Sequence, residues 1–362
     1  MLSRNEQLAV ARIHHLTAES WTMIDALIRH RFFQRPAETW TTEQLRTIGL
    51  RPEHIQALHQ ARSPLSLAEV KARLDQYHLT VLTVLDDEYP SILQQISKPP
   101  PLLYVRGQIS SLSRPALAVV GTRQPSPYGQ TVISRFVQPI AAAGVTIISG
   151  LALGIDTFAH QAALNAHQPT IAVLGSGIDV IYPWANRGLA DQIVAQGGAI
   201  ISEFPLGAEP LHYHFPQRNR VIAGLARATL LVEAGEKSGA LITAKFALDA
   251  NRDVLAVPGP ITSPASVGVN SWLKLGAQAV TSAEDILQLY HLQPGQQTRL
   301  PEQPTAEPNE GLVLQHLSFE PIHIDMLAEK IGKSVGETGA LMTIMEMKGL
   351  VTSIGNGLFV RK

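Results

Sequence analysis

Short runs of apolar, often β-branched residues alternate with longer stretches of helical periodicity through the middle of the chain. The runs lie at Ala116–Val120, Val145–Ser149, Thr170–Leu174, Ala199–Pro205, Ala228–Ala234 and Asp253–Gly259. This alternation is typical of βαβ units, in which parallel strands are buried between helices on both faces. The pattern predicts an α/β core with a doubly wound, mostly parallel, Rossmann-like sheet. In such sheets the ligand lies at the carboxyl ends of the strands, where the connecting loops gather.

The first part of the chain is predicted to be helical. Apolar residues recur at spacings of three and four in Leu8–Ile13 and again from Met23 to Ile28, as on one face of a helix. We expect a small helical domain over residues 1–78, of the SAM or helix-hairpin-helix kind. Two strands, Leu79–Leu85 and Leu102–Val105, then lead into the core domain, which we place at residues 79–290.

A separate C-terminal domain is predicted after a linker. Residues 291–308 are rich in Pro, Gln and Thr, a composition typical of linkers. Residues 309–362 show three helical stretches and then a hairpin pattern, which together indicate a winged-helix domain. Its third helix has Glu337 and Glu346 against only Lys348 near its end. Phosphate contacts need cations, so we favour a protein partner for this domain, with DNA as the open alternative.

The composition limits the class of protein. The 362 residues are 45% hydrophobic, enough for two or three folded cores, and include no cysteine, which excludes disulfides and thiolate chemistry. No run is long enough to span a membrane and the chain starts without a signal-peptide pattern, so we expect a cytoplasmic protein with no membrane partner. The formal net charge is −1, and residues 114–285 hold eleven basic and eleven acidic side chains. A polyanion site must therefore come from local placement of cations.

The segment Phe215–Gly224 carries the strongest local signal. Arg218, Asn219 and Arg220 are consecutive and have no acidic neighbour, and the apolar run that follows indicates the start of a buried helix. Guanidinium groups at a helix start favour an anion, because the free N–H groups and the helix dipole add to their charge. We therefore predict that these three side chains bind an anionic ligand.

Two loops at strand ends supply further candidates. Arg123 follows the glycine at the end of the first core strand, where it can reach over the sheet edge to a phosphate or stack on a base. Ser126 is placed to cap the next helix. In the following unit, Gly150 and Gly154 would let the backbone approach an anion closely.

A third group of candidates lies before a later helix. Lys237, Ser238 and Gly239 come directly before a predicted helix that includes Thr243. Serine, glycine and free amides at a helix start suit a phosphate, although the segment does not have the order of a Walker A loop. The complete predicted binding set is Arg123, Ser126, Gly150, Gly154, Arg218, Asn219, Arg220, Lys237, Ser238, Gly239 and Thr243.

In order and wording, these motifs closely resemble the DNA-processing protein A family, DprA or Smf, over roughly Tyr89–Leu287. The motifs that carry the resemblance are GTRQPSPYG (121–129), GLALGIDTFAH (150–160), GSGIDVIYPWAN (175–186), FPQRNR (215–220) and KSGALITA (237–244). The resemblance implies a homodimer that binds and protects incoming single-stranded DNA. It also implies that the protein helps to load RecA recombinase on that DNA, in natural transformation or recombination, without cofactor or catalysis.

Two segments depart from the family pattern. Trp184 stands where the family often has a basic residue after Tyr-Pro, so we expect it either to stack on a base or to pack on its own loop. His14–Ser20 lacks the glycine-rich turn with which such helical modules approach phosphate. We therefore favour packing or a partner role for the N-terminal domain over direct DNA contact.

Two other classes of function remain open at this point. The first is a Rossmann-type nucleotide or nucleoside-monophosphate hydrolase with Glu203 or Glu233 as general acid, although neither has an evident partner. Related phosphoribohydrolases rely on a PGGxGT-type loop, and Val257–Ile261 lacks its second glycine. Asp156 and His160 share a helix face, but two ligands do not make a metal site, so we predict no metal. The second class is a scaffold whose end domains hold partners.

Overall fold

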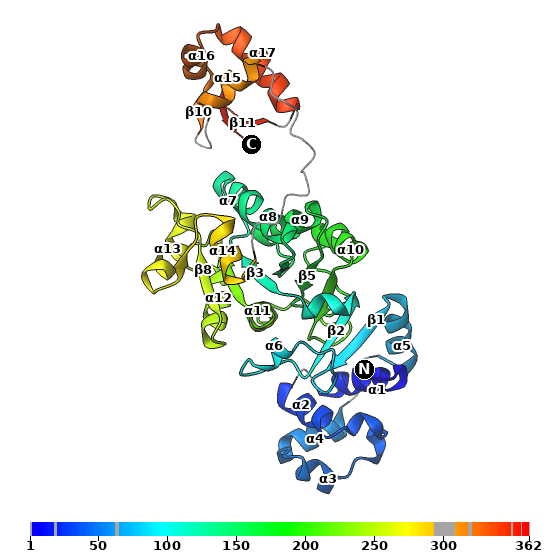
Figure 1. The fold of residues 1–362 in the computed structure, drawn as a ribbon. Coiled ribbons are helices and arrows are strands. Elements are labelled where there is room, and N and C mark those ends of the chain that lie inside the picture. The colour runs from blue at the N-terminus through cyan, green and yellow to red at the C-terminus, as the bar shows by residue number, and fades with distance from the viewer. Residues whose placement is uncertain are drawn as a thin grey trace. The chain divides into compact units, whose positions relative to one another are not determined.

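The chain folds into two compact units, Met1–Pro294 and Gly295–Lys362, which are considered separately (Figure 1). The computed structural model describes residues 2–17, 20–61, 65–292, 308–317, 321–348, 350–355 and 357–361. The predicted linker lies largely outside the described residues.

A nine-stranded sheet forms the centre of the first unit, in the order β1-β2-β6-β5-β4-β3-β7-β8-β9. The strands are β1 Leu79–Thr83, β2 Leu102–Gly107, β3 Ala116–Val120, β4 Thr146–Ser149, β5 Thr170–Val173, β6 Ala199–Ser202, β7 Ala228–Leu231, β8 Asp253–Ala256 and β9 Gln278–Ala279. From β6 to β9 all neighbours are parallel, whereas β1 and β2 add an antiparallel edge. The predicted doubly wound, mostly parallel sheet is confirmed.

Helices cover both faces of this sheet. They are α6 Ser91–Gln94, α7 Pro127–Val132, α8 Gln138–Ala142, α9 Ile155–Asn165, α10 Arg187–Ala195, α11 His214–Gly224, α12 Gly239–Asp249, α13 Val267–Lys274 and α14 Ala283–Leu289. Short turns of 3-10 helix lie at η3 Ile109–Ser113, η5 Trp184–Asn186 and η6 Pro264–Ser266, and the π-helix η4 Ile133–Val137 joins α7 to α8.

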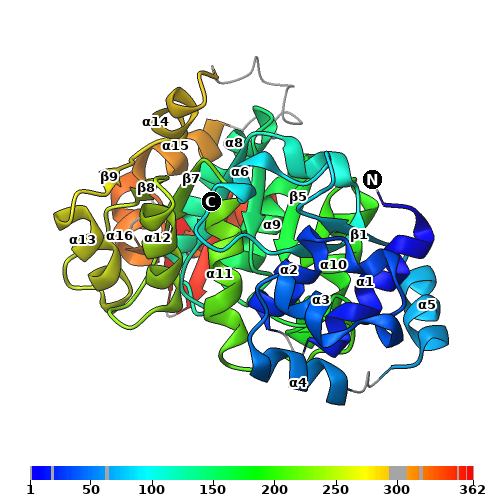
Figure 2. The same ribbon diagram turned by 90° about the horizontal axis from the view of Figure 1, so that it is seen from below.

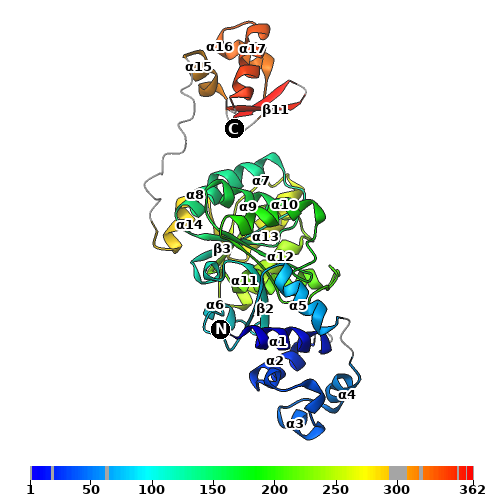
Figure 3. The ribbon, with the colours of Figure 1, turned by 90° about the vertical axis from the view of Figure 1, so that its right-hand side faces the viewer.

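Alternate residues of β3 show how the two faces are buried. Leu117 and Val119 belong to a core with α8, α9 and α14, whereas Ala118 and Val120 belong to a core with α11 and α12. Figures 1 and 3 show α8, α9 and α10 on one side of the sheet and α11 on the other. In Figure 2, α11 and α12 run beside each other, as their packing requires. Such two-sided burial explains why the strands are apolar throughout rather than alternating.

The strand order reverses at β3. The chain proceeds from β3 outward to β4, β5 and β6, and then returns to place β7 on the other side of β3. The loops after β3 and β7 therefore leave the sheet in opposite directions. In doubly wound sheets this reversal opens a crevice at the carboxyl ends of the strands, which is where ligands bind.

Helices α1 to α5 form the N-terminal part of this unit, and α1 and α5 pack on the edge strand β1. They are α1 Arg4–Leu16, α2 Trp21–Arg29, α3 Thr42–Thr47, α4 Pro52–Gln60 and α5 Leu67–Gln76, with 3-10 turns η1 Phe32–Gln34 and η2 Ala37–Thr39. Arg4 Nη1 donates to Leu79 O at 2.7 Å, and Gln7 Oε1 accepts from Val81 N at 3.3 Å. Side chains of α1 thus occupy open hydrogen-bonding groups of the edge strand β1 and protect it from pairing with other chains. The predicted boundary after residue 78 remains a prediction.

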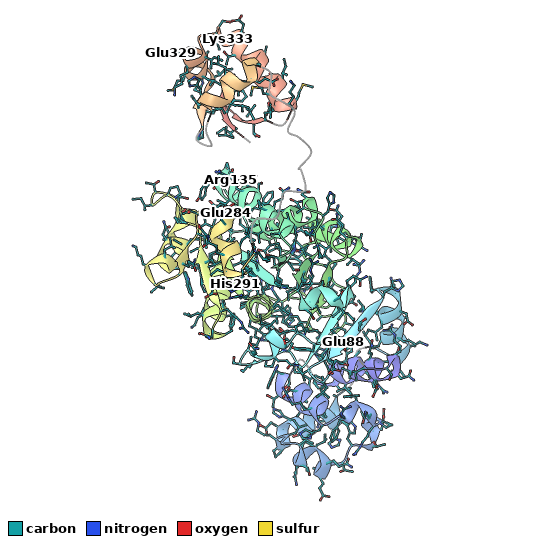
Figure 4. All side chains as sticks on the ribbon, viewed as in Figure 1. Glu88, Arg135, Glu284, His291, Glu329 and Lys333 are labelled. Atoms are coloured by element: carbon teal, nitrogen blue, oxygen red, sulfur yellow. The ribbon has the colours of Figure 1, made fainter. Side chains whose placement is uncertain are left out.

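The second unit contains three helices and a three-stranded sheet. The helices are α15 Pro308–His316, α16 Ile324–Ile331 and α17 Val335–Met347, and the strands are β10 Ile322–His323, β11 Val351–Gly355 and β12 Leu358–Arg361. The sheet order is β10-β12-β11, so the predicted winged helix is confirmed. Glu329 and Lys333, labelled in Figure 4, lie on α16 and just after it.

Two buried histidines should lower the free energy of unfolding in acid. Burial lowers the pKa of His14 and of His160 to about 3, whereas the pKa in an unfolded chain is about 6.5. A histidine with a lower pKa in the folded state stays neutral there. Its contribution to stability is therefore complete above about pH 6.5 and decreases as the pH falls toward about 3. At about pH 5, each histidine should reduce the free energy of unfolding by roughly 2 kcal/mol.

The variant His14→Asn isolates one of these contributions. His14 stacks on Tyr104 of β2, with 5.8 Å between ring centroids, and its Nδ1 lies 3.2 Å from the Tyr104 hydroxyl. Asn retains an amide near that position but does not titrate. Denaturant unfolding of both proteins from about pH 7.5 to about pH 5 should give a shallower decrease for the variant. Equal slopes would contradict a neutral, buried His14.

Candidate nucleic-acid interface

A cavity of about 600 Å³ lies at the reversal point of the sheet. Its wall is built from the ends of β3 and β7, the start of α9, one side of α11 and the first turns of α12. The residues that line it include Val120–Arg123, Ala152, Asp156, His212, Phe215, Pro216, Arg218, Asn219, Ile222, Gly235, Lys237–Ala240, Ile242 and Thr243. The cavity therefore brings together seven members of the predicted set, from three separate segments of the chain.

Arg218 is buried, contrary to the expectation of an open guanidinium at a helix start. Helix α11 already begins at His214. Pro216 is tolerated in its first turn, because a backbone N–H group there has no acceptor within the helix. Arg218 lies in the second turn and is 5% exposed. Its Nη1 donates to Gly150 O at 2.8 Å and also to Val173 O. The side chain thus ties α11 to the ends of β4 and β5 and forms part of the cavity floor.

Burial also shifts the ionisation of Arg218 and of its neighbour Asp156. It lowers the pKa of Arg218 to about 10, and the attraction of Asp156 opposes this shift, so the guanidinium stays charged at neutral pH. Burial raises the pKa of Asp156, an effect opposed by Arg218 and by hydrogen bonds from two backbone N–H groups. Those bonds run from Gly150 N at 3.0 Å and Ala152 N at 3.3 Å to Oδ2. Asp156 therefore fixes the loop after β4.

The two glycines of that loop serve protein packing. A Cβ at Gly150 would lie 2.5 Å from Arg218 Nη2. Gly154 has φ +80°, and a Cβ there would lie 2.5 Å from Thr122 O. We expected both glycines to make room for an anion, but at their Cα atoms the space is filled by Arg218 and by the backbone that carries Arg123.

Arg123 and Lys237 are the exposed cations of the cavity. Among the residues that the structure describes, neither forms an ion pair. The Arg123 guanidinium carbon lies 5.8 Å from the ring centroid of Phe215, within the range of a cation–π contact. Asp156 is the only carboxylate among the described lining residues, and it faces Arg218. The cavity therefore has a positive rim and a planar aromatic surface beside it.

The amino end of α12 forms the opposite wall. Ser238, predicted as a phosphate ligand, caps the helix by accepting a hydrogen bond from Ala240 N at 3.3 Å. Asn219 Nδ2 donates to Gly239 O at 3.3 Å and so links α11 to this helix start. Thr243 is almost fully buried one turn further along. Free N–H groups at this end, next to Lys237, suit an anionic group of a ligand.

Besides the two glycines, two further predicted residues lie outside the cavity, and both have structural partners. Ser126 caps α7, as predicted, and its N and Oγ donate to Glu233 at 2.9 and 2.6 Å, so its polar atoms are already used. Arg220 points to the other side of α11, where it forms an ion pair with Glu203. Arg218 and Asn219 thus line this cavity and Arg220 does not, since consecutive helical residues point about 100° apart. That Arg220 binds an anionic ligand stays a prediction.

Other aromatic residues near the cavity were not in the predicted set. Phe215 was within the motif but not singled out. Tyr182 and Leu153 line a smaller hollow with Arg123 and Phe215, and the Tyr182 ring lies 5.7 Å from that of Phe215. Trp184 is 71% exposed under the Arg187 guanidinium at 4.8 Å, so it does not pack into the fold. In the sequence, the signal for a stacking surface was the group of aromatic residues that follow strands β5 and β6, namely Tyr182, Trp184, Tyr213 and Phe215.

The pair Asp156 and His160 does not form a metal site. His160 is fully buried, and its Nδ1 lies 2.8 Å from Thr170 Oγ1. Across the described ranges of the chain, no group of three potential ligands comes together. No helix within these described ranges is long and apolar enough to cross a membrane.

Comparisons with known proteins agree with this architecture. A family model described as DNA recombination-mediator protein A matches residues 80–291, and one for the DprA winged helix domain matches residues 297–357. Protein Smf of Escherichia coli (strain K12) is 40% identical over 276 residues, which cover 74% of either chain. DNA processing protein DprA of Streptococcus pneumoniae (strain ATCC BAA-255 / R6) is 41% identical over 233 residues, 62% of this chain and 82% of the relative.

Two solved structures extend the comparison. That of DNA processing protein A from Streptococcus pneumoniae has a TM-score of 0.67 and 35% identity, and covers 80% of this chain and 98% of its own. That of DNA processing protein A from Helicobacter pylori, described as giving insight into a single-stranded DNA binding mode, has a TM-score of 0.54 and 28% identity. It covers 59% of this chain and 96% of its own. The sheet, the winged helix and these relatives together place the chain in the DNA recombination-mediator protein A family, known as DprA or Smf.

Proposed function

We propose that this protein binds single-stranded DNA in the cavity at the reversal point of the sheet. The observation that carries the proposal is the pair of exposed cations, Arg123 and Lys237, on either side of a cavity with a buried cation in its floor. Phe215 adds a ring on which a base can stack, and the start of α12 adds N–H donors. Cations for the backbone and rings for the bases are the combination used by proteins that bind single strands. The Helicobacter pylori relative, whose structure concerns single-stranded DNA, supports the choice of ligand.

We further propose that the bound strand is protected and handed to a RecA recombinase, and that the protein acts in the cytoplasm as a homodimer formed by the core. The family description, a recombination mediator, supports a recombinase partner. In the winged helix, the Glu337 carboxylate accepts a hydrogen bond from the α17 cap residue Ser334, and Lys348 pairs with Glu310 at 2.7 Å. The outward side of α17 includes Ile344 and Met347, 48% and 85% exposed. A helix with this surface suits a protein partner better than a phosphate backbone.

Catalysis is not part of the proposal. The two acids that could serve a hydrolase are each held by another residue: Glu203 by Arg220 and Glu233 by Ser126. A general acid must be free to donate its proton to the substrate, whereas these two carboxylates hold protein groups in position. Mononucleotides incubated with the protein should therefore remain intact by chromatography, and release of a free base or phosphate would favour the hydrolase.

The first test compares single-stranded with double-stranded DNA. An open cavity at loop ends accepts unstacked bases, whereas a duplex keeps its bases paired, so the single strand should bind more tightly and without ATP. Fluorescence anisotropy over a range of salt concentrations measures both affinities. With two or three cations in contact, the slope of log K against log salt for the single strand should be about −1.4 to about −2.1. Equal affinity for the two forms at physiological salt would exclude the proposed mode.

The second test separates the exposed arginine from the buried one. Arg123→Ala should weaken single-strand binding by roughly 1–3 kcal/mol without a change in thermal stability, because its charge faces solvent. Arg218→Ala should instead reduce the free energy of unfolding by about 3 kcal/mol, because two carbonyls and Asp156 lose a buried partner.

Binding assays and thermal unfolding of each variant distinguish these effects. Arg46→Ala, an exposed arginine on α3, removes the same charge away from the cavity and serves as the control. If Arg123→Ala behaved like Arg46→Ala in the binding assay, the cavity would not be the DNA site.

The third test removes the second unit. A chain ending at Pro294 keeps Tyr290, which donates to Ala116 O, and Leu292, which packs on the core. It should fold and bind single-stranded DNA within about tenfold of the full chain, or about 1.4 kcal/mol. A decrease of a hundredfold or more, with the folded core intact, would identify the winged helix as a DNA-binding module. Anisotropy and circular dichroism on both chains provide the comparison.

A further inference from the structure

A second cavity, of about 520 Å³, lies on the opposite side of α11 from the strand-end cavity. Tyr213, Gln217 and Arg220 of this helix region line it, whereas Phe215, Asn219 and Ile222 line the first cavity. Each trio is spaced by four and then three residues, so the two trios lie on two faces of one helix. The remaining wall comes from α1, α2, the segment before β2, the end of β6 and α12. One helix therefore separates two hollows.

Aromatic rings and a lysine give the second cavity its character. The rings are those of Trp21, Phe204, Tyr213 and Phe246. Tyr213 is 55% exposed and Trp21 and Phe246 are half-buried, whereas Phe204 is buried. Lys98 is an exposed residue of the lining, and Trp21 Nε1 donates to Pro99 O at 2.8 Å, which fixes the indole next to that lysine. Rings that are held in place and remain open to solvent can stack on a planar ligand.

Polar groups inside the cavity are positioned by an ion pair. Arg220 is bonded to Glu203, and their side chains are 16% and 12% exposed. Within the described part of the chain, Nη1 of Arg220 is buried without a hydrogen-bond acceptor. A buried donor without a partner costs stability, and an acceptor on a ligand would remove that cost. Lys98 and Arg220 exceed Glu203 by one positive charge, so an anionic ligand is favoured.

We propose that this second cavity is a nucleotide subsite, which takes up a nucleotide of the same single strand that occupies the first cavity. Stacking rings, a lysine at the opening and a buried guanidinium donor match the base and the phosphate of a nucleotide. The two cavities adjoin at the start of α11, where His212 lines the first and Tyr213 the second. A strand that leaves the first cavity over these residues need only cross one helix, about 10–12 Å wide with its side chains.

This inference rests on the proposed function, and oligonucleotide length separates the two. The thymidine dinucleotide pdTdT can occupy only one cavity, because a single internucleotide step is shorter than the width of the helix between them, whereas an oligo-dT of about 16 nucleotides can reach both. Anisotropy titrations of the full chain use both lengths, with dTMP as a third ligand. The variants are Lys98→Glu and Tyr213→Ala, and Lys71→Glu, an exposed lysine on α5, is the charge-matched control.

For the long oligonucleotide, each cavity variant should lower the affinity about tenfold, in line with one lost stacking or phosphate contact. For the short one the decrease should stay within about twofold, as it should for Lys71→Glu at either length. An oligo-dT with 5-iodouracil at successive positions should cross-link to a peptide that contains Tyr213 or Trp21 when the label reaches the second cavity.

Three outcomes would overturn the inference. If the long oligonucleotide binds both cavity variants as tightly as the wild type and no cross-link forms, the cavity holds no nucleotide, while binding of the short one leaves the proposed function intact. If dTMP binding is lost in the variants but the long oligonucleotide is unaffected, the cavity takes a free nucleotide and not the strand. If neither length binds the wild-type protein, the proposed function itself fails.

Discussion

The buried guanidinium group of Arg218 is the contact on which the strand-end cavity depends. It donates hydrogen bonds to backbone carbonyls at the ends of β4 and β5 and faces Asp156. The Asp156 carboxylate in turn accepts hydrogen bonds from two N–H groups of the loop after β4. Taking a charge out of water costs several kcal/mol unless it is paired and hydrogen-bonded. These partners offset that cost, and the arrangement holds a helix, two strand ends and a loop in one geometry.

This arrangement divides the cations by role. Arg218 contributes positive potential at the floor of the cavity. Its hydrogen bonds go to protein carbonyl groups, and these bonds hold α11 against the ends of β4 and β5. Arg123 and Lys237 remain exposed at the rim, and the close approach of Gly154 to the Arg123 segment fixes the loop that carries Arg123. A site whose walls are already ordered loses less entropy when a ligand binds. A chain with a net charge of −1 can therefore still present a positive surface to an anionic ligand.

Helix α11 organises both sides of this region. Its buried apolar residues Val221 and Ala223 anchor it to the sheet, and its amino-terminal half is left to form cavity walls on two faces. The ion pair between Arg220 and Glu203 stabilises the second face in the way that Arg218 stabilises the first. Each of the three consecutive polar residues of α11 therefore has a different partner. Arg218 bonds the ends of β4 and β5, Asn219 bonds the start of α12, and Arg220 bonds Glu203 after β6.

The sequence by itself determined the elements and their local ends. The alternating apolar runs predicted the sheet, Ser126 was predicted to cap a helix, and the pattern of the last fifty residues predicted a winged helix. These features could be predicted because hydrophobic periodicity and capping depend on near neighbours. Only the tertiary structure decided which polar residues face the ligand. Glu233 reaches Ser126 from 107 positions away along the chain, and Arg218 finds its carbonyl partners 68 and 45 positions away. Such partners, and the side of a helix that becomes buried, follow from packing between distant segments, which no local pattern encodes.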